Sequence, residues 1–175
     1  MANYTIDTAH SEINFKVKHL MITNVTGNFR QFTASMQSEA ADFSDAKITF
    51  EADVDSINTN NEQRDGHLKS DDFFNAPQYP KLTFVSKNLT RQSGDQYVLT
   101  GDLTIRNVTK EVTLHVEFGG VMVDPWGQHK AGFDITGTIN RKDFDLKWSA
   151  TTEAGGLVVS DEVKLQVSAQ MIKQG

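Results

Sequence analysis

The sequence predicts an all-β protein built as one domain over residues 1–175, either an antiparallel sandwich or a barrel. Apolar and polar residues alternate with a period of two along most of the chain, which is the pattern of strands with one apolar face. Turn-forming residues separate these runs, as they do between the strands of antiparallel sheets. No repeat, linker or low-complexity tract divides the chain, and 175 residues suit one domain.

The first alternating run follows Glu12, where Ile13, Phe15 and Val17 face one way and the intervening polar residues face the other. Later runs repeat this pattern, with apolar positions within residues 46–54, 82–86, 99–105, 112–118, 131–139 and 163–171. Turn signals stand at residues 93–95, 106–109 and 124–127. Closing such strands into a barrel removes exposed sheet edges.

Two runs contain irregularities. Between residues 24 and 37, Phe29 lies on odd parity, whereas Phe32, Ala34 and Met36 lie on even parity. A β-bulge between Phe29 and Phe32 is expected, because it would place all four side chains on one face. The pair at residues 119–120 is Gly-Gly inside a strand pattern, and we interpret it as a bulge or bend.

One segment around residues 60–75 is predicted to be a short helical excursion from the sheet. Residues 59–62 have the Thr-x-x-Glu form of a capping box, which opens a polar helix through about Lys69. Ser70 can cap a second turn that carries Phe73 and Phe74 and ends before Pro77. We expect this excursion to lie over one barrel mouth or along one side of the barrel.

Composition excludes several classes of function. The formal net charge is −6, which disfavours binding to nucleic acid and electrostatic docking on anionic membranes. The chain has no cysteine, so disulfides, thiolate metal sites and thiol nucleophiles are absent. No run approaches 18 consecutive apolar residues, so no transmembrane helix is expected. The N-terminus shows no signal peptide and predicts a cytoplasmic protein, although an exported mature form with an added Met would look the same.

Several short motifs follow one another along almost the whole chain. They are Tyr4-Thr5-Ile6-Asp7, His10-Ser11, Phe15, His19, Gly27, Phe29, Phe32, the segment Arg64-Asp65-Gly66-His67-Leu68-Lys69-Ser70-Asp71-Asp72-Phe73-Phe74, then Pro80, Phe84, Ser86, Leu99-Thr100-Gly101-Asp102-Leu103-Thr104-Ile105 and Arg141-Lys142-Asp143-Phe144. Each is weak alone. Together they resemble the YceI-like family of polyisoprenoid- and lipid-binding proteins.

This resemblance implies an eight-stranded antiparallel lipocalin-like barrel that holds a long apolar ligand: a polyisoprenoid, an isoprenoid quinone or a fatty-acid derivative. The chain departs from the family pattern at Asn107 and at Asp145, where glycine is usual. Asn tolerates positive φ better than most residues, so the turn at Asn107 can survive. The departure at Asp145 leaves the local backbone conformation there open.

The ligand contacts that we predict are apolar side chains on the inner face of the barrel. They are Ile13, Phe15, Val17, Phe29, Phe32, Phe50, Val54, Phe73, Phe74, Phe84, Leu103, Ile105, Leu114, Val116, Phe133 and Ile135. Small residues on the same faces could leave room for a ligand, namely Ala34, Ala52, Gly101, Ala131, Gly137 and Ala169. The alternative is that they accommodate bulky neighbours in a filled core. The pattern alone favours the filled core, and the resemblance favours a cavity.

Three polar residues are candidate headgroup contacts. His19 continues the inward parity of Ile13, Phe15 and Val17, and it is either a headgroup contact or a core histidine. His67 lies beside Arg64 in the helical excursion, and it either recognises a headgroup or forms a hydrogen-bonded clasp that ties the excursion to the barrel. Arg64 is the third candidate headgroup contact. No spacing typical of a zinc site is present, so neither a metal nor a cofactor is expected.

Three hypotheses of function follow. The first is a non-enzymatic carrier or store for a long-chain lipid. The second is an enzyme that acts on such a lipid with His19 or His67 as acid or base. The third is an interaction scaffold with a packed barrel and no ligand. The lipid is the expected partner, a homodimer is possible, and no nucleic acid is expected.

Overall fold

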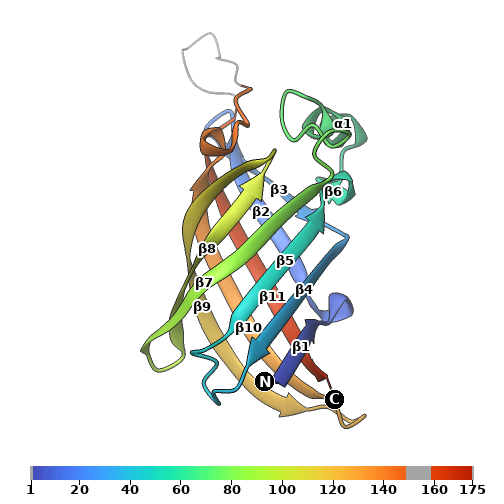
Figure 1. Cartoon of the computed structure of the whole chain (residues 1–175). Coiled ribbons are helices and arrows are strands. Elements are labelled where there is room, and N and C mark those ends of the chain that lie inside the picture. The colour runs from blue at the N-terminus through green and yellow to red at the C-terminus, as the bar shows by residue number, and fades with distance from the viewer. Residues whose placement is uncertain (1, 149–158, 175) are drawn as a thin grey trace.

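A computed structural model describes residues 2–148 and 159–174 as a closed antiparallel β-barrel with one short α-helix at one end (Figure 1). The end that carries the helix is called the upper end here. The strands are β1 (Ala2–Ile6), β2 (Glu12–His19), β3 (Thr23–Phe29), β4 (Phe32–Ser38), β5 (Lys47–Asp53), β6 (Ile57–Asn58), β7 (Lys81–Ser93), β8 (Gln96–Ile105), β9 (Val108–Val123), β10 (His129–Asn140) and β11 (Glu162–Gln174). The helix is α1 (Glu62–Lys69).

The barrel has eight strands because three of them are each broken in two. β11 pairs with β1 through residues 171–174 and with β2 through residues 164–168. β4 pairs with β1 and β5, while β3 pairs with β2 and β6. The pairs β1/β2, β3/β4 and β5/β6 therefore each form one interrupted barrel strand, and the predicted eight-stranded antiparallel barrel is confirmed.

The alternation in the sequence appears directly in the burial of the strands. β8 is the clearest case, since every second residue from Tyr97 to Ile105 is buried and the residues between them are only partly buried. The inner face of the sheet thus forms one continuous apolar core inside the barrel. Cross-strand pairs such as Phe50 with Phe84 stabilise it, because the side chains of directly opposed residues are in contact.

The change of parity between Phe29 and Phe32 takes a different form from the one predicted. Instead of one continuous strand with a bulge, Arg30 and Gln31 form a bend that separates β3 from β4. The partner strand is interrupted at the same level by the 3-10 helix η2 (Val54–Ser56), and the Arg30 amide donates to the Ser56 carbonyl at 3.2 Å. The bend still places the side chains on one face, as expected of the bulge, because Phe29 and Met36 are in the core and Phe32 and Ala34 pack against it.

The other irregular positions agree with their interpretations. Gly120 has a φ of 108°, and the register between β9 and β10 shifts beside it, so the Gly-Gly pair forms the expected bulge. Asn107 adopts a φ of 63° in the β8–β9 turn, as its tolerance of positive φ predicts. Asp145 has a φ of 65°, so it takes up the left-handed conformation that glycine would adopt more easily.

The helical excursion begins two residues later than the capping box predicts. Asn61 is the N-cap of α1, and its side chain accepts a hydrogen bond from the Arg64 amide at 3.0 Å. Thr59 instead donates its hydroxyl to Asp65 at 2.6 Å. The Thr-x-x-Glu pattern was therefore right about the helix and wrong about the capping residue, because Asn is an equally good cap and lies closer.

The lower end of the barrel is closed by Phe43 from the loop between β4 and β5. Phe43 is 3% exposed, and its ring lies 5.5 Å from Tyr4, 5.4 Å from Phe118 and 5.5 Å from Phe133. Its φ of 62° is unfavourable for a bulky residue, so this packing holds it in place. Tyr97 supports the loop by donating its hydroxyl to the Asp42 carbonyl at 2.6 Å.

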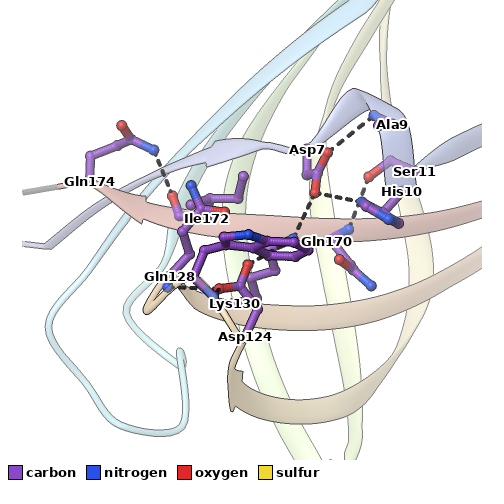
Figure 2. A network of polar contacts seen from close by, with 11 residues as sticks. Asp7, Ala9, His10, Ser11, Asp124, Gln128, Lys130, Gln170, Ile172 and Gln174 are labelled. Carbon is purple, nitrogen blue, oxygen red and sulfur yellow. Dashed lines mark hydrogen bonds and ion pairs between the residues drawn. The ribbon is translucent and has the colours of Figure 1, made fainter.

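A partly buried ionic network lies near the lower end, where β1, β10 and the β9–β10 turn meet (Figure 2). The Lys130 ammonium lies 3.0 Å from an Asp7 carboxylate oxygen and 3.5 Å from an Asp124 oxygen. Burial acts to raise the pKa of Asp7, but hydrogen bonds from His10 and Lys130 outweigh it and hold the pKa below 3.8. For Asp124, burial again acts to raise the pKa. Hydrogen bonds from the Gln128 and Trp126 amides and from Lys130 outweigh this effect, so the pKa of Asp124 is also lowered.

This network predicts a pH-dependent contribution to stability. A carboxylate with a lowered pKa stabilises the fold above its ordinary pKa, and the stabilisation disappears as the pH falls through the lowered value. The Lys130→Met substitution should therefore lower the melting temperature at about pH 7. The difference in melting temperature from the wild-type protein should shrink below about pH 4. Thermal melts of both proteins across that range test the prediction, and a deficit that stays constant with pH contradicts it.

Gly101 on β8 is required by close packing. A Cβ atom at this position would lie 2.5 Å from both the Phe84 ring and the Val85 carbonyl oxygen. Since the backbone oxygen cannot move freely, we expect Gly101→Ala to reduce the free energy of unfolding by about 1–3 kcal/mol. Gly132→Ala is the matched control, because nothing lies within 4 Å of its added methyl group. Urea unfolding of both variants measures the difference, and equal stabilities would contradict the packing argument.

Candidate functional site

The barrel encloses an apolar cavity of about 170 Å³. All of its lining residues are apolar except Asn14. Of the residues predicted to line a ligand site, it brings together Ile13, Phe15, Phe29, Phe50, Phe84, Leu103, Ile105, Leu114, Val116, Phe133 and Ile135. Phe133 also contacts Phe43, so the closed lower end forms the floor of this cavity.

A second cavity of about 240 Å³ lies above the first, toward α1. Val17, Phe73 and Phe74 line it, and so do all three predicted headgroup residues, His19, Arg64 and His67. The two cavities share wall residues, namely Phe15, Phe29, Leu82, Ile105, Ile139 and Leu165. Because they share these walls, they are adjacent along the barrel axis, and the second lies between the apolar interior and the upper end.

Two of the predicted lining residues do not line either cavity. Val54 is 2% exposed but belongs to η2, where the strand is interrupted, so it packs in the core away from the cavity walls. Phe32 is the first residue of β4, beside the bend, and its ring stacks on Phe50 at 6.4 Å. Period-two parity does not record where a strand is interrupted, which is why it does not separate these two residues from the cavity walls.

The small residues are divided between the two roles considered for them. Ala34 and Ala169 line the first cavity and leave it room. At Gly101 and Gly137 an added Cβ would collide with Phe84 and Leu114, respectively, so these glycines accommodate bulky neighbours. Ala52 and Ala131 are buried in the core and line neither cavity.

Many lining residues were not among those predicted, although most lie on the same alternating faces. The first cavity adds Ile6, Met36, Ile48, Leu82, Leu89, Leu99, Val112, Ile139, Leu165, Val167 and Met171. The period-two rule, applied to every alternating run, places most of these residues on the inner face. The predicted set is rich in phenylalanine and covers only part of that face. The second cavity adds Leu68, Arg141, Leu146 and Trp148, for which no periodic signal exists.

Arg64 holds the start of α1 to the chain that precedes it. Its Nε donates to the Thr59 hydroxyl at 2.8 Å, and its Nη2 donates to the Thr59 carbonyl at 2.7 Å. The Thr59 amide and hydroxyl in turn donate to Asp65. Arg64 therefore has a positioning role in the wall of the second cavity.

His67 connects the helix to two neighbouring aromatic residues. Its Nε2 lies 2.9 Å from an Asp72 carboxylate oxygen. Its ring meets the rings of Phe73 and Trp148 edge-on, at centroid distances of 5.1 and 5.0 Å. The excursion is also anchored by Arg106 in the β8–β9 turn, whose Nη1 donates to the Phe73 carbonyl at 2.6 Å. These contacts hold the roof of the second cavity over the barrel.

Arg141 is the most deeply buried charge beside the cavity, with a side chain that is 3% exposed. It donates to the carbonyls of Leu146 at 2.6 Å, Trp148 at 2.7 Å and Ser160 at 2.9 Å. Burial lowers the pKa of Arg141, and the nearby Asp161 carboxylate partly opposes this effect. Arg141 therefore organises the chain around the upper end of the barrel.

The ionisable residues that line the second cavity are all of the basic types. Within the described ranges 2–148 and 159–174, they are Lys18, His19, Arg64, His67 and Arg141, with neither Asp nor Glu among the lining residues. This contrasts with the net charge of −6 of the whole chain. Basic groups beside an apolar cavity favour a ligand whose apolar tail ends in a polar or negatively charged group.

Residues 2–148 and 159–174 contain no group of three or more His, Asp or Glu side chains placed to hold a metal ion. The same residues contain no helix that is long and apolar enough to cross a bilayer.

The sequence and the fold match known proteins over almost the whole chain. A family model of the YceI-like domain matches residues 4–171. A UPF0312 protein of Staphylococcus aureus strain MSSA476 is 42% identical over 171 residues, which cover 97% of each chain. Burkholderia cenocepacia BcnA has a TM-score of 0.82 at 25% identity, covering 94% of this chain and 98% of BcnA.

Two further solved structures share the fold. The Campylobacter jejuni YCEI protein has a TM-score of 0.77 at 34% identity over 90% of both chains. A polyisoprenoid binding domain from Saccharophagus degradans has a TM-score of 0.70 at 17% identity over 98% of both chains, which shows the fold alone. From the family model and the curated relative together, the chain belongs to the YceI-like family.

Proposed function

We propose that this protein binds one long-chain lipid inside its barrel, as a carrier or store and without catalysing a reaction on it. The lipid is a polyisoprenoid, an isoprenoid quinone or a fatty-acid derivative. The observation that carries the proposal is the pair of adjacent cavities, apolar at the closed lower end and basic toward the upper end. The Saccharophagus degradans domain of the same fold is a polyisoprenoid binding domain, which supports this choice by analogy.

The cavity volumes set the size of the ligand portion inside the barrel. A cavity of about 150 Å³ lined by Leu, Ile and Phe stays dry and binds benzene. The first cavity, at about 170 Å³, has a similar lining and accommodates an apolar group of comparable bulk. A long ligand therefore places its apolar end there, passes through the second cavity and extends beyond the upper end.

The energetics suit reversible loading. Burying each methylene group from water contributes about 0.8 kcal/mol, so a long tail is held firmly against release into water. The natural alternative for such a lipid is a bilayer, which is equally apolar. Transfer between bilayer and barrel is thus close to neutral, as a carrier or store requires.

Extraction of the purified protein with organic solvent, followed by mass spectrometry, tests the proposal. We expect a lipid in proportion to the protein, or stoichiometric uptake when the protein is loaded with a polyisoprenoid or a long-chain fatty acid. Absence of any bound lipid in both experiments would contradict the proposal. Turnover of a bound lipid to a product would favour the enzyme hypothesis instead.

The basic lining predicts a preference among headgroups. Lys18→Gln removes one positive charge at the rim of the second cavity, where Lys18 is exposed. We expect the affinity for a long-chain carboxylate to fall by up to about fivefold, since an exposed charge pair contributes roughly 0.2–1 kcal/mol. The affinity for an uncharged isoprenoid of similar length should not change. Competition against a fluorescent lipid measures both, and an equal loss for both ligands contradicts the prediction.

A further inference from the structure

The β2–β3 turn exposes three consecutive apolar side chains at the upper end of the barrel. Leu20 is 41% exposed, Met21 62% and Ile22 79%. We call residues 20–22 the apolar tip. None of them lines a cavity, but the preceding residue, His19, lines the second cavity. The apolar tip therefore projects from the wall of the proposed lipid site.

The backbone conformation of the apolar tip is unfavourable, as is the exposure of its side chains to water. Leu20 has a φ of 54° and Met21 a φ of 61°, both in the left-handed region. Asn and Gly adopt this conformation readily, whereas large apolar residues rarely do. Strained residues that also expose apolar surface point to a function that uses this surface.

The strands that carry the apolar tip are basic within an acidic protein. No Asp or Glu occurs between Glu12 and Glu39, whereas Lys16 and Lys18 lie on β2. Lys164 of β11 is directly opposite Lys16. The overall charge of −6 argues against docking on anionic membranes. Near the apolar tip, however, Lys16, Lys18 and Lys164 outnumber Asp161 and Glu162, which follow Ser160 beside Lys18, so the local charge is weakly basic.

A second apolar patch lies at the other end of the barrel, and it serves as a comparison. Val121, Met122 and Trp126 of the β9–β10 hairpin are 66%, 74% and 82% exposed. That end is closed by Phe43 and its aromatic neighbours, so a membrane there could not exchange lipid with the cavities directly. A bilayer at the apolar tip would instead face the basic second cavity.

We propose that the apolar tip inserts into the headgroup region of a phospholipid bilayer and places the upper end of the barrel against the membrane. Lys16 faces anionic headgroups beside the inserted side chains. The lipid then passes between bilayer and barrel without crossing water. This inference rests on the proposed lipid-binding function, which it extends by naming the membrane-facing end.

The test uses a variant that favours the turn while removing its apolar surface. Leu20→Asn, Met21→Gly and Ile22→Thr are combined, because Asn and Gly suit the left-handed positions and Thr keeps the β-branched shape of Ile22 while adding a hydroxyl. The melting temperature should be unchanged or higher. Vesicle flotation and the transfer of a fluorescent polyisoprenoid between vesicles should both fall at least tenfold, while lipid already loaded into the protein is retained.

Two further variants control the test. Val121→Thr with Met122→Thr removes a similar apolar area at the closed end, and it should leave flotation and transfer unchanged. Lys16→Gln should reduce flotation on vesicles of phosphatidylcholine with added phosphatidylglycerol, and have little effect with phosphatidylcholine alone. Together these outcomes assign both the membrane-facing end and its charge preference.

Other results overturn the inference. Unchanged flotation and transfer in the tip variant, or losses in the closed-end variant alone, show that the apolar tip is not the docking surface. A shift in oligomeric state by light scattering with no change on vesicles shows that it contacts a second copy instead. If the wild-type protein takes up no lipid, the proposed function fails, while the flotation of wild type against tip variant still decides membrane docking.

Discussion

Replacing Ala34 and Ala169 with phenylalanine is expected to abolish lipid loading while leaving the barrel folded. Both alanines line the first cavity, where two added phenyl rings would occupy space that the apolar end of the ligand needs. Displacing as few as two methylene groups into water costs about 1.6 kcal/mol, which is more than a tenfold loss of affinity. Quantitative mass spectrometry after loading with a polyisoprenoid measures the change.

The control for this double variant is Val85→Phe. Val85 is 53% exposed on the outer surface of the barrel, so the added ring does not reach the interior. We expect normal loading in the control and a melting temperature in the double variant that is maintained or raised, since the new rings fill a cavity. A folded double variant that still binds a full equivalent of lipid would show that the ligand lies elsewhere.

The sequence could predict those residues of the site that lie on the alternating faces of the strands. Ile13, Phe15 and Phe133 lie on strict period-two faces, and all three line the first cavity. Parity also places Leu99 and Met171 on the inner face, and both are buried there. An antiparallel barrel imposes this alternation on every strand, so a local pattern carries information about a global interior.

The part that could not be predicted depends on loops. Phe43 closes the lower end from a loop with a positive φ, and no periodicity marks it. Trp148 reaches the second cavity from the chain that follows the 3-10 helix η3 (Arg141–Phe144). The positions of such residues depend on how two ends of a closed sheet are covered, and a linear pattern does not specify this. The basic lining of the second cavity is hidden for the same reason, because its members come from separate elements.

Arg141→Met is expected to destabilise the fold by about 3–5 kcal/mol, the cost typical of removing one partner from a buried charged cluster. The guanidinium donates to the carbonyls of Leu146, Trp148 and Ser160, and its removal leaves these oxygens without donors. Each unpaired buried group costs about 1–3 kcal/mol. Methionine has a similar apolar stem, so the loss reports on the hydrogen bonds and not on a cavity. Urea denaturation of both proteins gives the difference.

The neighbouring Lys142 supplies a matched control for this last prediction. Its side chain is 42% exposed and lies 3.4 Å from the Asp161 carboxylate, which also lies near Arg141. Because solvent screens an exposed pair, Lys142→Met should cost less than about 1 kcal/mol. Arg141→Lys should recover little stability, since one ammonium cannot reach three carbonyls that a planar guanidinium spans. If Arg141→Met proves as stable as Lys142→Met, these carbonyls find other donors, and the upper end of the barrel does not depend on Arg141.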